Sequence, residues 1–568
     1  MNGSPRFHPE AQADICLLLE GTFPYVRGGV STWVRQMIEG MPHLRFSIIY
    51  LGAEAGSQGE PAYELPDNVV HLETHWLLGN AVEEVAVGGL LGRVQRWIGK
   101  SGTSRRKQQG FVENNEMHTR LRDAWQSRQN SAELDEGKGA TSAGEDVVQL
   151  SKRRTAGVIG ADVVRKFTEL LLGPDAITEQ DLQQDRAAWE TIREKYNDAP
   201  PGLDFNHFFW TVRSMHGPLF TLSRIVAQAP PASVYHSVST GYAGFLGAML
   251  KSQTGKPLII SEHGIYTKER ELDLAQVEWI PQDLDPFKVG LNDNLNYLRS
   301  VWIRFFASLG RMTYGAADQV FTLYDGNRQR QLLDGADDSR LSIIPNGVAV
   351  QKYSAVRRAD DAAVPPVLAL IGRVVPIKDI KNFIRAMRIV RARMPAAEGW
   401  LFGPEDEDED YTRECKMLVE SLGLSHVVKF QGFGKPEEIF PQVGLSVLTS
   451  VSEGQPLVVL EGFAAGIPAV TTDVGSCSEL IYGVDEADRQ LGSAGAVVPI
   501  SDPAAFADAA IELLSDREAW LSASRTAIAR VETYYDEVDM IARYQGVYET
   551  QMKNAASDSV VPLRSRAA

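Results

Sequence analysis

The chain has 568 residues, of which 44% are hydrophobic and 23% charged. This composition is ordinary for a soluble globular protein, and the length is too great for one compact core. A formal net charge of −17 disfavours a nucleic-acid binder, which needs a basic face. Three widely spaced cysteines, Cys16, Cys415 and Cys477, indicate neither a zinc cluster nor a disulfide framework. Without a signal-peptide core or a long apolar stretch, we expect a cytoplasmic protein.

The first half of the chain alternates strands with helices. An apolar run at 15–19 predicts a strand, and a loop ending at Gly28 and Gly29 leads from it into a helix at 30–38. This alternation is typical of a parallel sheet covered by helices. Further strands are predicted at 46–51, 234–238, 258–261, 317–323 and 342–345, and helices at 205–226 and 240–250.

An insertion at about 80–200 interrupts this pattern. Its stretch at 130–147 is polar and has few large apolar residues, which is typical of a mobile segment. Residues 90–107 are amphipathic and basic, so they could rest on an anionic membrane surface. We favour the alternative, a solvated helix packed on the domain.

A polar segment at 351–366 predicts the linker to a second α/β domain. We therefore divide the chain into domains at 1–355 and 356–535, followed by a segment at 536–568 whose tail we expect to be disordered. The second domain is predicted to contain strands from 367 and at 399–402, 427–431 and 445–448, and helices at 379–391, at 411–422 and from about 503.

The stretch at 450–466, S-V-S-E-G-Q-P-L-V-V-L-E-G-F-A-A-G, predicts a loop and a helix after a buried strand. The helix is expected to begin at Pro456, since proline is tolerated at the first helical position. Glu453 then lies in the loop and Glu461 in the helix. Ligands of open parallel sheets bind at the carboxyl ends of strands, and a helix N-terminus there attracts anions. Two carboxylates beside an anion site indicate a ligand with phosphates and hydroxyls, such as a nucleotide sugar.

Two basic residues follow the first strand of the second domain. Arg373 and Lys378 stand between that strand and the next helix, so they should project near the same edge as Glu453. An arginine can bind a diphosphate bidentately, and a lysine meets it as a point charge. If a diphosphate is the leaving group, cations fixed beside it stabilise its growing charge.

These motifs carry a family resemblance. G-R-V-V-P-I-K-D and S-E-G-Q-P-L-V-V-L-E-G-F-A-A-G resemble the retaining glycosyltransferases of family four, whose hallmark is two glutamates separated by seven residues. The N-terminal L-L-L-E-G-T-F-P-Y-V-R-G-G-V and S-E-H-G-I-Y are more particularly similar to the cytoplasmic glycosyltransferases of bacterial Pel exopolysaccharide synthesis. The resemblance implies an α/β protein with the GT-B fold, in which two Rossmann-like domains face each other across a cleft. It also implies that the final helix crosses back to the first domain.

The resemblance further implies roles for individual residues. The catalytic set would be Glu453, His263, Lys378 and Arg373. Glu461 would bind the ribose, and Glu453 would bind the donor sugar with the backbone of Gly454 and Gln455 close by. Arg373 and Lys378 would bind the diphosphate. Gly28 and Gly29 would approach the donor phosphate, and His263 would approach the sugar. No metal and no cofactor beyond the UDP-sugar donor would be required.

We therefore expect a retaining hexosyltransferase that uses UDP-glucose or a UDP-N-acetylhexosamine to build a Pel-type exopolysaccharide. Its partners would be the growing polysaccharide and an inner-membrane polysaccharide synthase complex, to which it would bind peripherally. Two alternatives stay open, namely a nucleotide-sugar epimerase of the same fold and a UDP-sugar-binding scaffold of such a complex.

Overall fold

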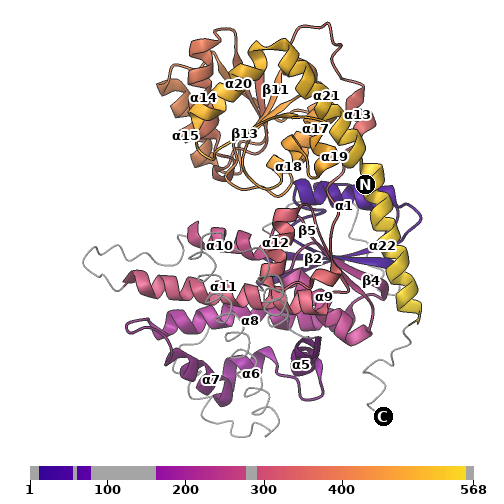
Figure 1. Cartoon of the computed structure of the whole chain (residues 1–568). Coiled ribbons are helices and arrows are strands. Elements are labelled where there is room, and N and C mark those ends of the chain that lie inside the picture. The colour runs from indigo at the N-terminus through magenta and orange to yellow at the C-terminus, as the bar shows by residue number, and fades with distance from the viewer. Residues whose placement is uncertain (1–11, 55–59, 79–160, 277–290, 558–568) are drawn as a thin grey trace, which may run out of the picture. The chain divides into compact units, whose positions relative to one another are not determined.

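The computed structural model describes residues 12–54, 60–78, 161–276 and 291–557 (Figure 1). The chain divides into two compact units. The first comprises Met1–Phe321, Gln329–Ser342 and Gly546–Ala568, and the second comprises Thr322–Arg328 and Ile343–Gln545. The predicted basic segment at 90–107 and the polar stretch at 130–147 lie outside the described residues.

The first unit is built on a sheet whose described part has seven strands in the order β3-β2-β1-β4-β5-β6-β7. The pairings from β3 to β5 are parallel, with Leu18 level with Ile49 on one side and Ser237 on the other. The central strands are almost wholly apolar, as expected for a sheet covered on both faces. The strands are β1 (Ala13–Glu20), β2 (Phe46–Glu54), β3 (Val69–Leu78), β4 (Ala232–Ser237), β5 (Leu258–Glu262), β6 (Gln319–Thr322) and β7 (Leu341–Ile343).

Helices pack on this sheet and on one another. Helix α9 (Tyr242–Thr254) lies against β1 and β4, and α8 (Phe205–Gln228) lies against β3. Helix α9 is apolar nearly all round because α11 (Leu291–Ala316) and α5 (Ala161–Leu172) cover its outer side. The described part of the insertion, from 161 on, is therefore helical. The remaining helices of this unit include α1 (Gly29–Gly40), α6 (Glu179–Gln184), α7 (Arg186–Tyr196) and α10 (Tyr266–Gln276), and α12 (Asp325–Asp334) runs across the division between the units.

The second unit has a sheet whose described strands follow the order β10-β9-β8-β11-β12-β13, and each of these pairings is parallel. Strand order reverses beside β8, because the chain moves outward to β9 and β10 and then returns to β11. Such a switch point is where open parallel sheets bind their ligands. The strands are β8 (Val367–Ile371), β9 (Glu398–Phe402), β10 (Val428–Gly432), β11 (Leu445–Leu448), β12 (Ala469–Thr472) and β13 (Gly495–Val498).

Helices cover both faces of the second sheet, where α14 packs on α20 and α17 on α21 (Figure 1). Asp379 caps α14 by accepting a hydrogen bond from the Asn382 backbone N–H. The helices are α13 (Val350–Ser354), α14 (Ile380–Arg393), α15 (Glu409–Ser421), α16 (Pro436–Ile439), α17 (Leu457–Ala464), α18 (Cys477–Tyr482), α19 (Glu486–Arg489), α20 (Pro503–Ser515), α21 (Arg517–Tyr534) and α22 (Glu537–Ser557).

The last turns of α22 belong to the first unit, because residues from Gly546 on cluster with it. The Tyr548 hydroxyl lies 2.7 Å from Nδ1 of His236, which is fully buried on β4. The ring of Tyr548 also packs against Phe46 of β2, with centroids 6.5 Å apart. Residues separated by hundreds of positions therefore share one core.

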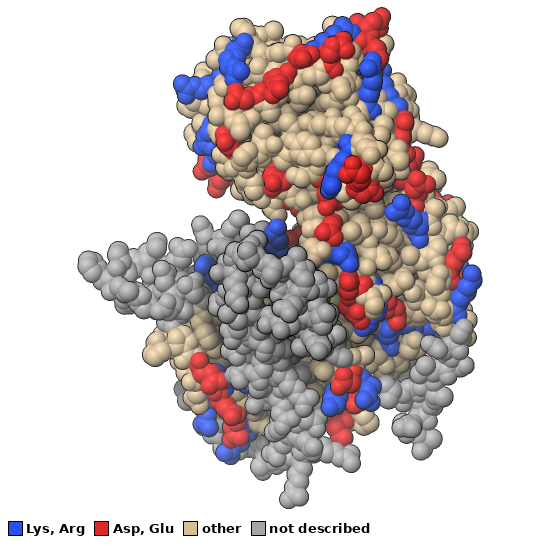
Figure 2. All heavy atoms as spheres, in the orientation of Figure 1, with Lys and Arg blue, Asp and Glu red and all other residues tan. Residues whose placement is uncertain are grey.

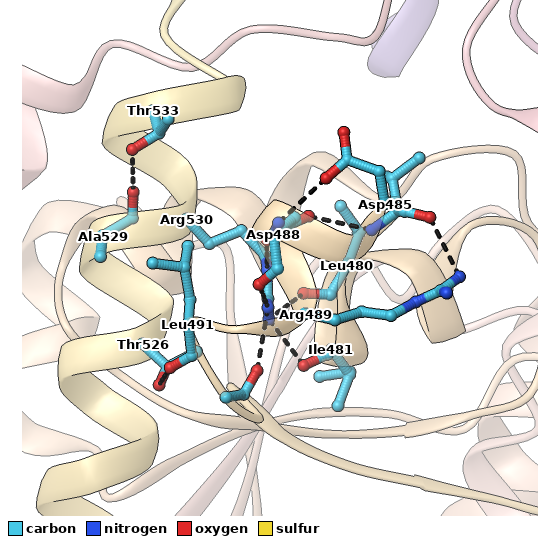
Figure 3. Close-up of polar contacts among 12 residues, drawn as sticks. Leu480, Ile481, Asp485, Asp488, Arg489, Leu491, Thr526, Ala529, Arg530 and Thr533 are labelled. Carbon is cyan, nitrogen blue, oxygen red and sulfur yellow. Dashed lines mark hydrogen bonds and ion pairs between the residues drawn. The ribbon is translucent and has the colours of Figure 1, made fainter.

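A buried guanidinium holds helices α18, α19 and α21 of the second unit together (Figure 3). Arg530 of α21 and Asp488 of α19 form an ion pair with 2.6 Å between Nε and Oδ1, and their side chains are 0% and 1% exposed. The remaining N–H groups of Arg530 donate to backbone oxygens at 2.7–3.2 Å. Every N–H group of the guanidinium thereby makes a hydrogen bond, which is the condition under which a buried charge is tolerated. The four accepting carbonyls belong to Leu480, Ile481, Asp488 and Gly492.

On the visible face of the second unit, acidic side chains form a band along the upper part, basic side chains lie mainly at the edges, and uncharged residues cover most of the rest (Figure 2). Among the ion pairs of this unit, the side chains of Lys381 and Glu414 are 29% and 54% exposed. In the ranges that the structure describes, no helix combines the length and the apolar character needed to cross a bilayer.

Candidate functional site

Two neighbouring strand ends of the second sheet carry the predicted polar residues. Strands β8 and β11 are parallel neighbours, so the loops that follow them leave the sheet at the same edge. The loops are bonded together, because the Thr449 hydroxyl donates to the Lys378 carbonyl at 2.8 Å and the Val451 N–H donates to the Ile377 carbonyl at 2.9 Å. Lys378 ends the short 3₁₀ helix Pro376–Lys378 and is thus held against the loop of Glu453.

Glu453 is held through one of its two carboxylate oxygens. Its Oε1 accepts from Lys378 Nζ at 2.5 Å and from the Ser450 hydroxyl at 2.6 Å. The side chains of Lys378 and Glu453 are 21% and 14% exposed, so water screens the pair only in part. In the described part of the chain, Oε2 of Glu453 accepts no hydrogen bond, and Lys378 has two further N–H donors. The pair can therefore serve a hydroxyl and a phosphate at once. Ser450 was not among the predicted residues.

Arg373 follows the same strand but points to another partner. Its guanidinium is paired with Glu407, and both side chains are nearly half exposed. The backbone beside it is fixed, since the Gly372 N–H donates to the Phe402 carbonyl at 2.8 Å. The structure thus places Lys378, but not Arg373, in contact with Glu453. A diphosphate role for Arg373 stays a prediction, and it requires that the exposed pair with Glu407 open.

Gly454 and Gln455 fix the loop of Glu453 to its surroundings. The Gly454 carbonyl accepts from the Ser476 N–H at 2.9 Å. The Gln455 side chain is buried and accepts from the Asn346 N–H at 2.6 Å, so it is turned toward the start of the second unit. The facing Gly475 has a φ of +57°, and a Cβ there would lie 2.2 Å from the Gly454 oxygen. Only glycine fits this approach.

Helix α17 carries Glu461 and begins one residue later than predicted. Pro456 is extended and stands at the N-cap, and Leu457 is the first helical residue. A proline at this place still fits, because its missing N–H would have no partner in the first turn. The Glu461 Oε1 accepts from the Tyr353 hydroxyl at 3.0 Å. Burial raises the pKa of Glu461 to about 7, against the hydrogen bond from Tyr353 and the charge of Lys352, which lower it.

The predicted residues of the first unit follow two of its central strands: Gly28 and Gly29 lie where the loop after β1 joins α1, and His263 comes directly after β5. Gly28 is extended and precedes α1, whose first turn has no side-chain cap. The Gly28 carbonyl accepts from the Thr32 N–H at 3.0 Å, and Gly28 and Gly29 are exposed. Free N–H groups at a helix start suit an anion. The structure leaves this end of α1 exposed, and a phosphate role for Gly28 and Gly29 stays a prediction.

His263 follows β5 and is buried, 7% exposed. Its ring meets the Trp33 ring edge to face, with centroids 4.7 Å apart. Burial lowers the pKa of His263 to about 4, so the imidazole is neutral near neutral pH. The preceding Glu262 is fully buried and receives hydrogen bonds from Thr240, Tyr314 and Gln331. A neutral His263 can accept or donate one hydrogen bond, but it supplies no charge.

Comparisons with known proteins agree with the two-unit architecture. A family model described as Domain of unknown function (DUF3492) matches residues 13–339, and one described as Glycosyl transferases group 1 matches residues 365–516. The sucrose-phosphate synthase of Thermosynechococcus elongatus has a similar structure, with a TM-score of 0.52 and 14% identity over 95% of this chain and 100% of that one. This likeness confirms the predicted fold class, α/β with two Rossmann-like domains of the GT-B kind.

Curated relatives match a smaller part of this chain than the sucrose-phosphate synthase structure does. The D-inositol 3-phosphate glycosyltransferase of Nocardia farcinica is 28% identical over 227 residues, which is 38% of this chain and 47% of the relative. That of Geodermatophilus obscurus is 30% identical over 253 residues, 41% of this chain and 53% of the relative. The chain thus spans about half the length of the curated relatives it matches. Because the first family model covers more than half of the chain, the chain belongs to the family described as Domain of unknown function (DUF3492), and residues 365–516 are similar to the group 1 glycosyl transferases.

Proposed function

We propose that this protein is a retaining glycosyltransferase that takes a sugar from a UDP-sugar, either UDP-glucose or a UDP-N-acetylhexosamine. The observation that carries the proposal is the pair of Lys378 and Glu453 at the switch point of the second sheet. The pair offers a carboxylate oxygen for sugar hydroxyls beside spare ammonium donors for the diphosphate. The match of the group 1 glycosyl transferase model to the same domain supports it.

In the proposed reaction, the bond between the anomeric carbon and the diphosphate oxygen breaks as the acceptor oxygen bonds to the same carbon. The acceptor attacks from the face that the diphosphate leaves, and its proton passes to the departing phosphate oxygen. Negative charge grows on the diphosphate, and Lys378 stabilises it without having to move far from Glu453. Glu453 holds the donor sugar, and Glu461 accepts hydrogen bonds from the ribose. No metal or further cofactor takes part.

We further propose that the product is a bacterial exopolysaccharide of the Pel type, as for the glycosyltransferase PelF. The N-terminal motifs around Gly28 and His263 support this narrower proposal, because they carry the resemblance to that subgroup. The acceptor is then the growing polysaccharide. The protein acts in the cytoplasm at an inner-membrane polysaccharide synthase complex, to which it binds peripherally.

A product assay tests the proposal. The purified chain is incubated with each of a panel of UDP-, GDP- and ADP-sugars, with and without an oligosaccharide acceptor, and products are identified by mass spectrometry and by the anomeric coupling in NMR spectra. We expect transfer from a UDP-sugar with retained configuration. A changed sugar nucleotide without acceptor would identify an epimerase, and binding without conversion would identify a scaffold; either result refutes the transferase.

Nucleotide binding is tested separately by calorimetry with UDP. Replacing Glu461 by Ala removes the proposed ribose acceptor, and a lost hydrogen bond to a charged group costs about 1.5–3 kcal/mol, or roughly ten- to a hundredfold in affinity. The matched control is Glu438→Ala, which removes an exposed carboxylate that pairs with Lys435 at 3.9 Å. An unchanged UDP affinity in Glu461→Ala would contradict the ribose role.

A further inference from the structure

Residues 346–357, which we call the brace, run along helix α17. The linker predicted at 351–366 overlaps this segment at 351–357, and the brace lies within the second compact unit. It contributes the short helix α13, which packs on α17. The brace bonds to the start, the middle and the end of the α17 segment, through Asn346 to Gln455, Tyr353 to Glu461 and Arg357 to Ala464.

The contact in the middle is the one that reaches a functional carboxylate. The Tyr353 hydroxyl donates to Oε1 of Glu461 at 3.0 Å, and Tyr353 itself is only 4% exposed. Its ring is fixed from two sides, by Phe440 at 6.1 Å between centroids and by the Lys352 ammonium at 5.1 Å from its centroid. In the described chain, Oε2 of Glu461 accepts no hydrogen bond. The phenol therefore holds one oxygen and leaves the other available.

We propose that Tyr353 is a positioning residue for Glu461: its hydroxyl fixes one carboxylate oxygen so that the other can accept from a ribose hydroxyl of the nucleotide. This inference rests on the proposed function, since it assigns Tyr353 to the ribose contact of that same site. Tyr353 does not itself touch the ligand. It acts on the direction of the Glu461 side chain and on its state of ionisation.

The ionisation of Glu461 depends on the groups around it. Burial raises its pKa to about 7, Tyr353 and Lys352 lower the pKa, and the Glu437 carboxylate raises it. Only the ionised carboxylate offers both oxygens as acceptors, so nucleotide binding needs the charged form. Loss of the Tyr353 hydroxyl removes a donor to the charged form and so raises the pKa of Glu461 further. The cost to binding is then largest in acid solution, smaller at neutral pH, and fades in alkaline solution.

The test compares Tyr353→Phe with the full-length wild type by calorimetry with UDP at about pH 6, 7, 8 and 9. If the pKa of Glu461 rises by about one unit, its ionised fraction at pH 7 falls from about one half to about one tenth. UDP affinity relative to wild type should then be about fivefold lower at pH 7 and nearly restored at pH 9. Because protonation of UDP itself affects both proteins equally, it cancels in the ratio of the two UDP affinities at each pH. Tyr535→Phe, which removes the hydroxyl of another buried tyrosine of this unit, should bind like the wild type at every pH.

A second variant separates the possible failures. In Glu461→Gln, which has no carboxylate to ionise, adding Tyr353→Phe should change UDP affinity by the same factor at every pH. Equal affinity of Tyr353→Phe and wild type, or a loss that does not vary with pH in the presence of Glu461, overturns the positioning role while leaving UDP binding intact. Absence of UDP binding by the wild type at every pH would instead refute the proposed function. If Tyr353→Phe does not fold, the ratio of the UDP affinities of wild type and Glu461→Gln is measured instead, and a ratio that does not vary between about pH 6 and 9 overturns the inference.

Discussion

Replacing Arg530 by Met should destabilise one end of the second domain far more than its position on an ordinary helix suggests. The substitution leaves the Asp488 carboxylate buried without its partner and removes the donors of four carbonyls around α18 and α19. Breaking a buried ion pair from one side costs about 3–5 kcal/mol. The methionine fills part of the volume, so loss of hydrogen bonds and of charge compensation should dominate over a cavity.

Hydrogen–deuterium exchange read by mass spectrometry suits this question, since the whole chain unfolds in more than one step. Peptides that cover 477–492 should lose protection equivalent to about 3–5 kcal/mol in Arg530→Met. The control is Arg525→Met in the same helix, whose pair with Asp360 at 2.7 Å is 63% and 69% exposed, and it should exchange like the wild type. Removing both partners in Arg530→Met/Asp488→Leu should recover part of the loss. Equal protection in the two arginine variants would refute the reasoning.

Further substitutions probe the candidate site. Lys378→Gln should lower kcat by roughly a hundredfold in an assay of UDP release, because the leaving diphosphate loses its cation; a wild-type kcat would refute that role. Ser450→Ala should raise KM for the donor by about tenfold, since Glu453 loses one of two donors to its Oε1. Glu461→Gln should gain stability over the wild type as pH rises. Folding raises the pKa of Glu461 from 4.5 to about 7, because the folded protein disfavours the charged carboxylate. The free energy of unfolding of the wild type therefore falls by on the order of 3 kcal/mol as the pH rises from 4.5 to about 7. Thermal midpoints at about pH 5 and 8 would show it, and an equal difference at both would argue against it.

The sequence predicts best where one physical signal dominates. Strand β11 has the bounds that its apolar run indicates, Leu445–Leu448. Strand β3 was not predicted, because His71, Glu73 and His75 interrupt the apolar alternation on the face that also carries the buried Val69 and Leu77. The two imidazoles flank the carboxylate at 3.3 and 3.2 Å, and this pairing lets polar side chains occupy a covered position. A pattern of hydrophobic alternation cannot detect such a strand.

In the candidate site, too, some contacts can be predicted from the sequence and others cannot. The contact between Lys378 and Glu453 follows from two neighbouring parallel strands, which a motif search can place at one edge. The contact of Tyr353 with Glu461 could not be predicted in this way, because Tyr353 stands in a five-residue helix within a polar stretch that resembles a linker. The partner of Arg373 also escaped prediction, since an exposed pair with Glu407 depends on how a loop of acidic residues folds.

The tyrosine at position 548 has a consequence for how this protein is made. A domain at the beginning of a chain usually completes its fold while the ribosome is still synthesising the later domains. Here the hydroxyl that meets His236 and the ring that meets Phe46 are translated only after the whole second domain. The core of the first domain therefore cannot be completed until α22 has been synthesised. Until then, the surface of its sheet that α22 later covers is exposed. We expect this interval to be the period in which the nascent chain depends most on chaperones.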